Sequence, residues 1–264
     1  DSRNNCNAVI ETATNTLLRG CRNTVIPDNI EAFGSLSMSN LKTFTIQTLP
    51  STVKYIGVYA FLNCESITSM TIPGSVKTID DEAFHGCVGM NSLTIEKGVE
   101  TIGAGAFSSC LALTRLTLPV TIQSLGGSMI FESFDIKTIE VLFGEPIPIK
   151  ESTFDTFYKP STMTLYVPKG CREAFAAADY WKEFGQIIET DEDAEPLEYF
   201  YSYINDTKMY FKILNHESKT VQIGLGDEPA IDTAVSGELI LPSEVKGYTV
   251  TGIAANAFAG CAGL

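Results

Sequence analysis

The chain has 264 residues, of which 44% are hydrophobic and 19% charged, so it can bury a core and is not a disordered tail. Its 18 Lys and Arg against 32 Asp and Glu give a net charge of -14. That charge excludes nucleic acid as a partner, because such binding depends on basic side chains that neutralise phosphates, and it argues against docking on an anionic membrane. No apolar run is long enough to predict a transmembrane segment.

The two ends of the sequence predict that it is part of a longer protein. It opens with DSRNNCNAV, without a signal peptide, and it closes on FAGCAGL in the middle of a pattern. Residues 1–23 predict a hairpin cap that turns around residues 12–15, with VIE and LLR as its arms. Cys6 and Cys21 would then face each other across the strands, where a disulfide is permitted in an oxidising location.

An internal repeat of 23 residues organises the next part of the chain. Ala-Phe-x-x-Cys recurs at that period, and a fourth copy keeps the register with Ile130 for Phe and Ser133 for Cys. Upstream, residues 41–61 fit the same unit with three extra residues, which aligns Thr45 with Thr71. The structural anchors of the repeat are Phe61, Cys64, Phe84, Cys87, Phe107 and Cys110, and Phe258 and Cys261 repeat them near the end.

Each repeat predicts one coil of a solenoid. Leu113, Leu116 and Leu118 fit a short strand with alternate side chains inward, and Val76 and Ile79 fit a second extended piece. The Ala-Phe-x-x-Cys segment is too short for a stable helix and predicts a helical or 3₁₀ turn. One unit cannot bury its apolar face alone, so stacked coils would pair their strands into a curved parallel sheet over residues 24–168.

The chain beyond the array predicts a cap and a second array. A strand over residues 163–167 would lead into a helix over about 171–184, within a helical cap at 169–190 whose apolar face holds the single Trp, Trp181. Residues 191–196 are an acidic linker, and residues 197–264 start a second, truncated repeat unit.

The pattern Leu-x-x-Leu-Thr-Ile-Pro-x-x-Val-x-x-Ile-x-x-x-Ala-Phe-x-x-Cys resembles the BspA-like leucine-rich repeats of bacterial surface proteins. It covers about residues 24–168 and returns from about 238 to 264, and YVPKG…YWKEF resembles the usual ending of that family's arrays. The resemblance implies a leucine-rich-repeat solenoid in an exported or cell-surface protein that adheres to host proteins, cells or other bacteria. It carries no catalytic residue set.

The residues that could carry chemistry favour structural roles. The seven cysteines contain no C-x-x-C pair, so the repeat cysteines and Cys261 are interpreted as buried thiols, with a disulfide between coils or a metal as the alternatives. His85 occupies a variable surface position and His216 a polar turn, and neither has a nucleophile placed beside it. The carboxylates at 80–82 fit a solvated face better than an acid/base pair. We therefore expect no catalytic site, no metal and no cofactor.

A candidate binding face follows from the strand alternation. The outward positions form one column of Thr45, Thr71, Thr94, Thr117 and Glu140, and beside it a column of Thr43, Ser69, Ser92, Arg115 and Thr138. These side chains serve either as plain β-favouring surface or as a face for a protein or glycan partner. Tyr59, Tyr158 and Tyr166 are the aromatic side chains to test beside it. The leading hypothesis is a secreted or cell-surface adhesion module, and the alternative is a structural spacer that displays other domains.

Overall fold

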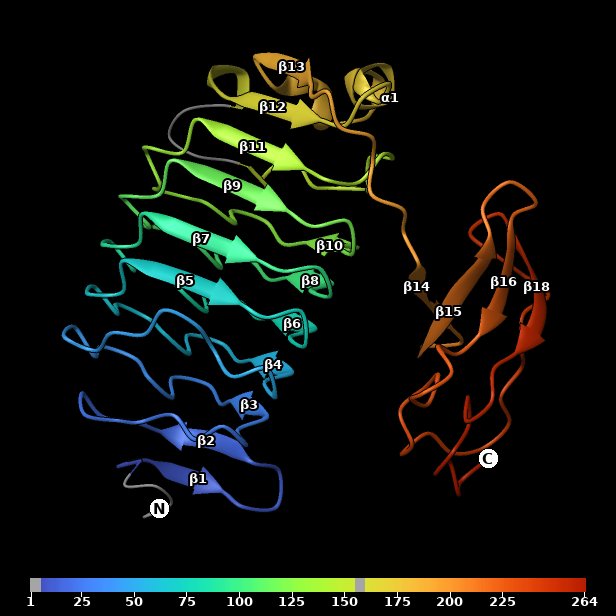
Figure 1. Ribbon diagram of the computed structural model, residues 1–264, viewed down its shortest axis with the longest axis horizontal. Coiled ribbons are helices and arrows are strands. Elements are labelled where there is room, and N and C mark those ends of the chain that lie inside the picture. The colour runs from blue at the N-terminus through green and yellow to red at the C-terminus, as the bar shows by residue number, and fades with distance from the viewer. Residues whose placement is uncertain (1–5, 155–159) are drawn as a thin grey trace. The chain divides into compact units, whose positions relative to one another are not determined.

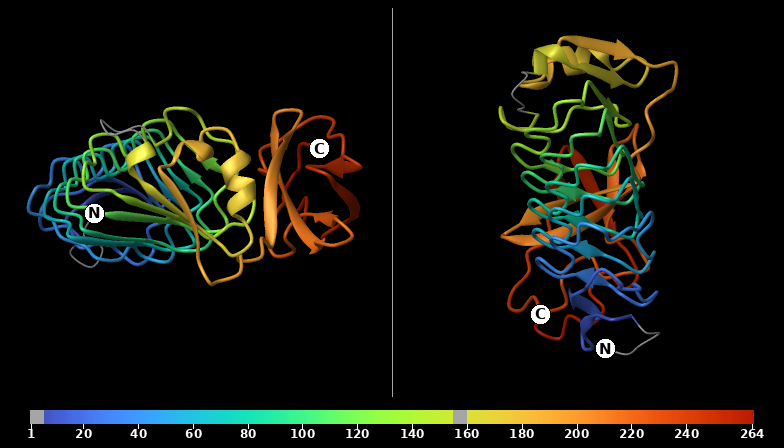
Figure 2. Two further views of the ribbon diagram at one scale, coloured as in Figure 1. Left: turned by 90° about the horizontal axis from the view of Figure 1, so that it is seen from above. Right: turned by 90° about the vertical axis from the view of Figure 1, so that its left-hand side faces the viewer.

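The computed structural model describes residues 6–154 and 160–264, and the chain divides into two compact units, Asp1–Glu195 and Pro196–Leu264. The first unit is a stack of coils in which two layers of parallel strands lie on opposite sides of a shared core (Figure 1). Seen from above, successive coils lie over one another (Figure 2). The prediction of a parallel repeat solenoid is therefore confirmed.

The layer of short strands begins at the predicted hairpin. β1 (Val9–Glu11) and β2 (Thr16–Arg19) are antiparallel, and β2 then pairs in parallel with β3 (Ala32–Phe33). No disulfide joins Cys6 to Cys21. The remaining strands are each two residues long, and together they give a sheet in the order β1-β2-β3-β4-β6-β8-β10. They are β4 (Tyr55–Ile56), β6 (Thr78–Ile79), β8 (Thr101–Ile102) and β10 (Ser124–Leu125).

The opposite layer holds the longer strands, all of them parallel. β5 pairs with β7, and a second group has the order β13-β12-β11-β9, with β7 and β9 next to each other. Each strand has four residues, two of which point inward. The strands are β5 (Ser69–Ile72), β7 (Ser92–Ile95), β9 (Arg115–Leu118), β11 (Thr138–Val141), β12 (Thr164–Val167) and β13 (Gln186–Glu189).

The repeat anchors form a continuous spine through the stack. The rings of Phe61 and Phe84 are parallel with centroids 5.0 Å apart, and Phe107 follows at 5.7 Å from Phe84. The Cys87 thiol donates to the Phe61 carbonyl of the preceding coil at 3.3 Å, and the Ser133 hydroxyl makes the same bond to Phe107 at 2.8 Å. The thiol column thus ties each coil to the coil before it.

Two positions in each of five successive coils adopt the left-handed backbone conformation, with φ between 51° and 72°. Only glycine reaches this region without strain, and most of these positions hold other residues. Hydrogen bonds between coils hold them in place, as where the Tyr59 N–H donates to the Asp81 carbonyl at 3.1 Å. One position is occupied by Leu36, Tyr59, Glu82, Gly105 and Ser128, and the other by Asn40, Asn63, Gly86, Ser109 and Glu132.

The C-terminal end of the array differs from the prediction of one helix over 171–184. α1 (Arg172–Ala177) ends early because Ala178 is extended and Tyr180 has φ 64°, and a 3₁₀ turn follows at η3 (Trp181–Glu183). Another 3₁₀ turn, η2 (Pro160–Thr162), precedes β12. Trp181 is buried as expected, and its indole N–H donates to the Ile147 carbonyl at 2.8 Å. The rings that pack around it are those of Phe143, Phe154, Phe175 and Phe184.

The second unit is a five-stranded sheet in the order β14-β15-β16-β18-β17 with its own core. The pairing of β16 with β18 is parallel, and the other pairings are antiparallel. Phe258 and Cys261 are only partly buried, so the expectation that Cys261 is a fully buried thiol was wrong, since no coil among the described residues covers it. That a second array begins here stays a prediction. The strands are β14 (Tyr199–Ile204), β15 (Thr207–Asn215), β16 (Thr220–Ile223), β17 (Glu244–Val245) and β18 (Tyr248–Ile253).

Replacing Phe84 by Ala tests the spine. Phe84 is fully buried between two rings, so we expect the substitution to lower the free energy of unfolding by about 3–5 kcal/mol. Chemical denaturation of the whole chain, followed by circular dichroism, measures the change. Leu111→Ala is the control because Leu111 is 41% exposed. If Phe84→Ala lowers the free energy of unfolding no more than the control does, the ring stack does not contribute to the stability of the array.

Candidate binding face of the repeat array

The long strands turn two columns of side chains outward, and we call these columns the sheet face. The register sets them directly, since Ser69 lies opposite Ser92, Thr71 opposite Thr94 and Thr117 opposite Glu140. The columns continue beyond the predicted residues to the last two strands. One column is Thr48, Thr71, Thr94, Thr117, Glu140, Tyr166 and Ile188, and the other is Ile46, Ser69, Ser92, Arg115, Thr138, Thr164 and Gln186.

The alignment that put Thr45 opposite Thr71 was wrong. Thr48 forms the bridge with Thr71, and the Thr71 N–H donates to the Gln47 carbonyl at 2.7 Å. The register therefore places Ile46, not Thr43, beside Ser69. The preceding coil has no extra residues.

The alignment failed because the anchor residues change in this coil. Met38 and Leu41 stand 23 residues before Phe61 and Cys64, so the period itself continues. The Met38 N–H donates to the Ala60 carbonyl just as the Phe61 N–H donates to Ala83. A search of the sequence for the period alone, without requiring Phe and Cys, identifies this coil.

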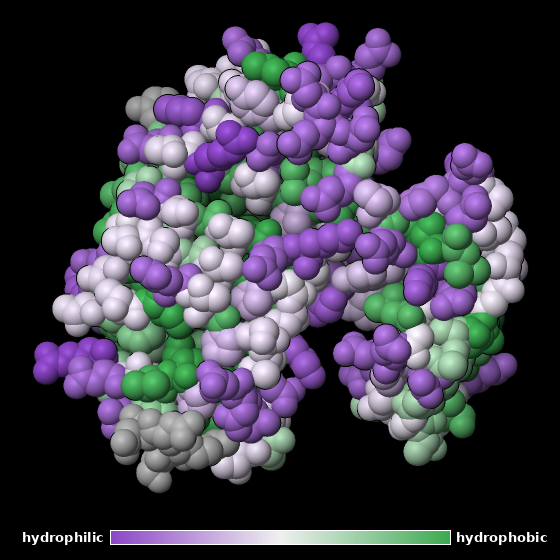
Figure 3. All heavy atoms as spheres, in the orientation of Figure 1, coloured by the Kyte–Doolittle hydropathy of each residue, from purple (hydrophilic) through white to green (hydrophobic). Residues whose placement is uncertain are grey.

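The sheet face changes character along its length. Up to Ser92 and Thr94 it carries uncharged side chains, all of them short hydroxyls except Ile46, and in Figure 3 pale residues of near-neutral hydropathy cover much of this part of the array. Beyond Thr94 it carries a cation, a carboxylate, an aromatic ring and an exposed aliphatic side chain. We call these four residues, Arg115, Glu140, Tyr166 and Ile188, the terminal cluster.

The terminal cluster is held together by direct contacts. Arg115 Nη2 lies 2.8 Å from Glu140 Oε2, and the same carboxylate oxygen accepts a hydrogen bond from the Thr117 hydroxyl at 2.9 Å. The Arg115 guanidinium carbon lies 5.6 Å from the centre of the Tyr166 ring, within the range of a cation–π contact. The Glu140 side chain is 19% exposed and that of Arg115 is 52% exposed. Arg115 and Tyr166 are therefore accessible at the surface of the cluster, whereas the Glu140 carboxylate is mostly covered.

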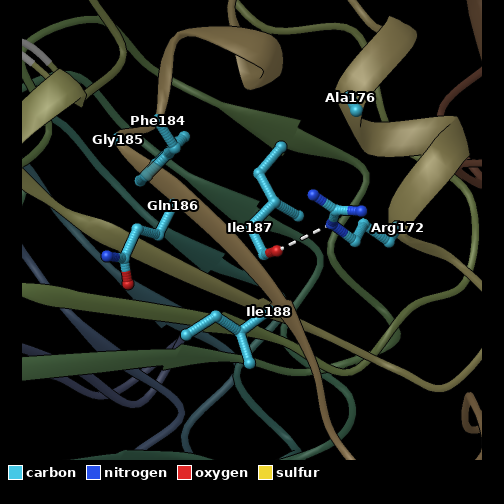
Figure 4. A pocket seen from close by; sticks show the side chains of 7 residues that line it. All are labelled: Arg172, Ala176, Phe184, Gly185, Gln186, Ile187 and Ile188. Carbon is cyan, nitrogen blue, oxygen red and sulfur yellow. Dashed lines mark hydrogen bonds between the residues drawn. The ribbon is translucent and has the colours of Figure 1, made fainter.

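Two hollows adjoin the ends of the sheet face. A hollow of about 390 Å³ borders Thr45, Ile46 and Thr48 at the first coil end. Another of about 410 Å³ lies between α1 and β13 and borders Gln186 and Ile188. Figure 4 shows Arg172 reaching from α1 to this hollow, where its Nε donates to the Ile187 carbonyl at 3.1 Å. Each end of the sheet face therefore borders a concave surface.

The other candidate groups fasten coils to one another. Tyr55 donates to the Asp80 carboxylate, and Tyr59 donates to Glu82 at 2.8 Å, so Tyr59 is not on the sheet face. Burial and the bond to Asp80 raise the pKa of Tyr55 to about 12. His85 Nδ1 lies 3.4 Å from the Glu82 carboxylate. Tyr158 lies outside the described residues.

Searches for two other kinds of site found none within residues 6–154 and 160–264. No group of three or more His, Cys, Asp or Glu side chains is arranged to hold a metal ion in these ranges. In the same part of the chain, no helix has the length and apolarity needed to cross a bilayer.

Two layers of parallel strands around an anchor spine define a solenoid of the leucine-rich repeat class. Residues 31–160 match the BspA type leucine rich repeat region in six copies. The array therefore belongs to the BspA-type leucine-rich repeat family. A search of the curated proteins finds no match.

The solved structures similar to this chain include a leucine-rich repeat protein, a vaccine antigen and a cell surface protein. A leucine-rich repeat protein of T. pallidum is 14% identical with a TM-score of 0.45, covering 70% of this chain and 81% of its own. The pneumococcal vaccine antigen PcpA is 15% identical with a TM-score of 0.30, covering 64% and 60%. A leucine rich cell surface protein of Faecalibacterium prausnitzii is 14% identical with a TM-score of 0.30, covering 97% and 79%.

Thiol labelling tests whether the repeat cysteines are structural. Burial raises the pKa of the Cys64 and Cys110 thiols to about 12 and that of Cys87 well above its usual value. Because a raised pKa keeps the thiol protonated, the reactive thiolate is scarcer than in an exposed cysteine at about pH 8. We expect these three to resist maleimide in the native protein while exposed Cys21 reacts, as read by peptide mass spectrometry. Unfolding in guanidinium chloride should make all seven reactive. Rapid native labelling of Cys87 would contradict the assignment.

Proposed function

We propose that the array is a non-enzymatic interaction module of a secreted or cell-surface bacterial protein, which binds a host or bacterial protein or glycan through the sheet face. The observation that carries the proposal is the two ordered columns that run from Thr48 to Ile188 on hydrogen-bonded parallel strands. Solenoids use extended regular surfaces of this kind to bind partners. Membership in the BspA-type family and the described surface location of similar proteins support the placement outside the cell.

The geometry favours recognition over chemistry. A nucleophile needs a base within hydrogen-bond reach, and the histidine of the array, His85, contacts a glutamate instead. The hydroxyls of the sheet face stand on neighbouring strands as repeated copies of one environment. Such a surface suits many shallow contacts with one large partner. A spacer that only displays other domains is the competing function, and it requires nothing of the outward side chains.

A binding panel separates these two functions. The whole chain is immobilised and titrated with purified extracellular-matrix proteins, mucin glycoproteins and intact bacterial cells. We expect saturable binding to at least one of them. Thr94→Lys should raise its Kd about tenfold or more, because a long charged side chain at the centre of the face blocks close approach.

Leu111→Lys is the matched control, since it adds the same charge at an exposed position off the sheet face. Equal binding by the Thr94→Lys and Leu111→Lys variants would place the contact elsewhere. No saturable binding to any ligand in the panel would favour the spacer.

A further inference from the structure

The geometry points to the terminal cluster as the contact centre of the sheet face, and to a protein segment with a carboxylate next to an apolar side chain as its partner. This inference rests on the proposed function and deepens it. It assigns unequal roles to the two parts of the face. The hydroxyl part, from Thr48 to Thr94, supplies complementarity, and the terminal cluster supplies most of the affinity.

Charge is the first reason. Arg115 is the one basic side chain in the two columns, and it lies on a chain with a net charge of -14. Its carboxylate partner is mostly covered, whereas the Arg115 side chain is about half exposed. A guanidinium has five N–H donors in a planar fork, and the contact with Glu140 Oε2 leaves donors that can bind a second carboxylate. The Arg115–Glu140 pair is formally neutral, but the N–H donors that it leaves free to bind are complementary to an acidic group.

The apolar side chains beside Arg115 specify the rest of the partner. Tyr166 lies opposite Ile188 across the last pair of strands, and Ile188 is 37% exposed. An aliphatic or aromatic side chain of the partner can pack on this pair while its carboxylate reaches Arg115.

The residue types favour a protein over a glycan as the partner. Tyr and Arg are, with Trp, the residues most enriched at the energetic centres of protein interfaces. The exposed Ile188 offers a sugar no hydrogen bond. The planar Arg115 fork is also held over the Tyr166 ring and beside Glu140, so less rotamer freedom is lost on binding than for an unsupported side chain.

The test uses a phage-displayed library of random peptides selected on the immobilised whole chain. We expect the enriched peptides to carry Asp or Glu next to a large apolar residue. For a synthetic copy of such a peptide, Arg115→Ala and Tyr166→Ala should each raise the Kd about tenfold or more, and Arg115→Lys should have an intermediate effect because it keeps the charge but loses the fork. Replacing the peptide's carboxylate by its amide should raise the Kd by a similar factor.

Ser92→Ala is the matched control on the same column, and we expect it to leave the Kd within about twofold. Thermal melts of each variant establish that the fold is kept. Enriched peptides that bind the wild type and both alanine variants equally overturn the inference while the proposed function stands. A selection that enriches basic peptides, or that enriches no peptide, also overturns the inference. The inference is overturned as well if only uronate or sialate glycans bind and Arg115→Ala abolishes that binding. Absence of binding across the extracellular panel defeats the proposed function itself, and is a separate result.

Discussion

The backbone register between coils is the constraint on which the rest of the array depends. Each coil of 23 residues must bring its N–H and C=O groups opposite those of the next coil at the short strand, the long strand and the anchor turn. At the turn, the Phe84 N–H donates to the Ala106 carbonyl at 2.9 Å. A slip of one residue would break all three ladders and turn each inward side chain of the strands outward. The register therefore tolerates changes of residue type but not of length.

The strained backbone positions follow from this register. In five successive coils two residues stay left-handed, even where the side chain is Leu36, Tyr59 or Glu82. Each of these costs about 1–2 kcal/mol relative to a relaxed conformation, and the coil-to-coil hydrogen bonds offset it. Polar contacts at the same spacing add to the ladders, as where Lys77 Nζ lies 3.3 Å from the fully buried Glu100 carboxylate, and Lys54 lies 3.1 Å from Glu31. Charges are thus used between coils as well as on the surface.

The sequence predicted the parts of the fold in which apolar residues repeat. Phe and Cys at a fixed spacing predicted the spine, and the alternation around Leu116 and Leu118 predicted which side chains the long strands bury. The coil with Met38 and Leu41 was misaligned, because a flexible, fully buried Met and a partly buried Leu stand at the positions of Phe and Cys and hide the period. The helix at residues 172–177 was overextended, because Phe175, Trp181 and Phe184 also have helical spacing when a left-handed Tyr180 separates two short turns. The pairing of Tyr166 with Ile188 required β13, a strand that the predicted helical cap did not contain.

Regular pairing continues through the strands that carry the terminal cluster. β9, β11, β12 and β13 are joined along nearly their whole length, whereas the coil that carries Thr48 contributes only one isolated bridge to the same layer. Side chains on fully paired strands keep fixed neighbours, which is why Arg115 can contact Glu140 on the next strand and the Tyr166 ring on the strand after it. In the hydroxyl part only the coil of Thr48 is loosely paired, since β5 and β7 pair at all four residues. The terminal cluster is preorganised by its contacts, and preorganisation raises affinity by lowering the entropy lost on binding. The same repeat that prevents variation inside the coils leaves the outward positions free to differ from one strand to the next.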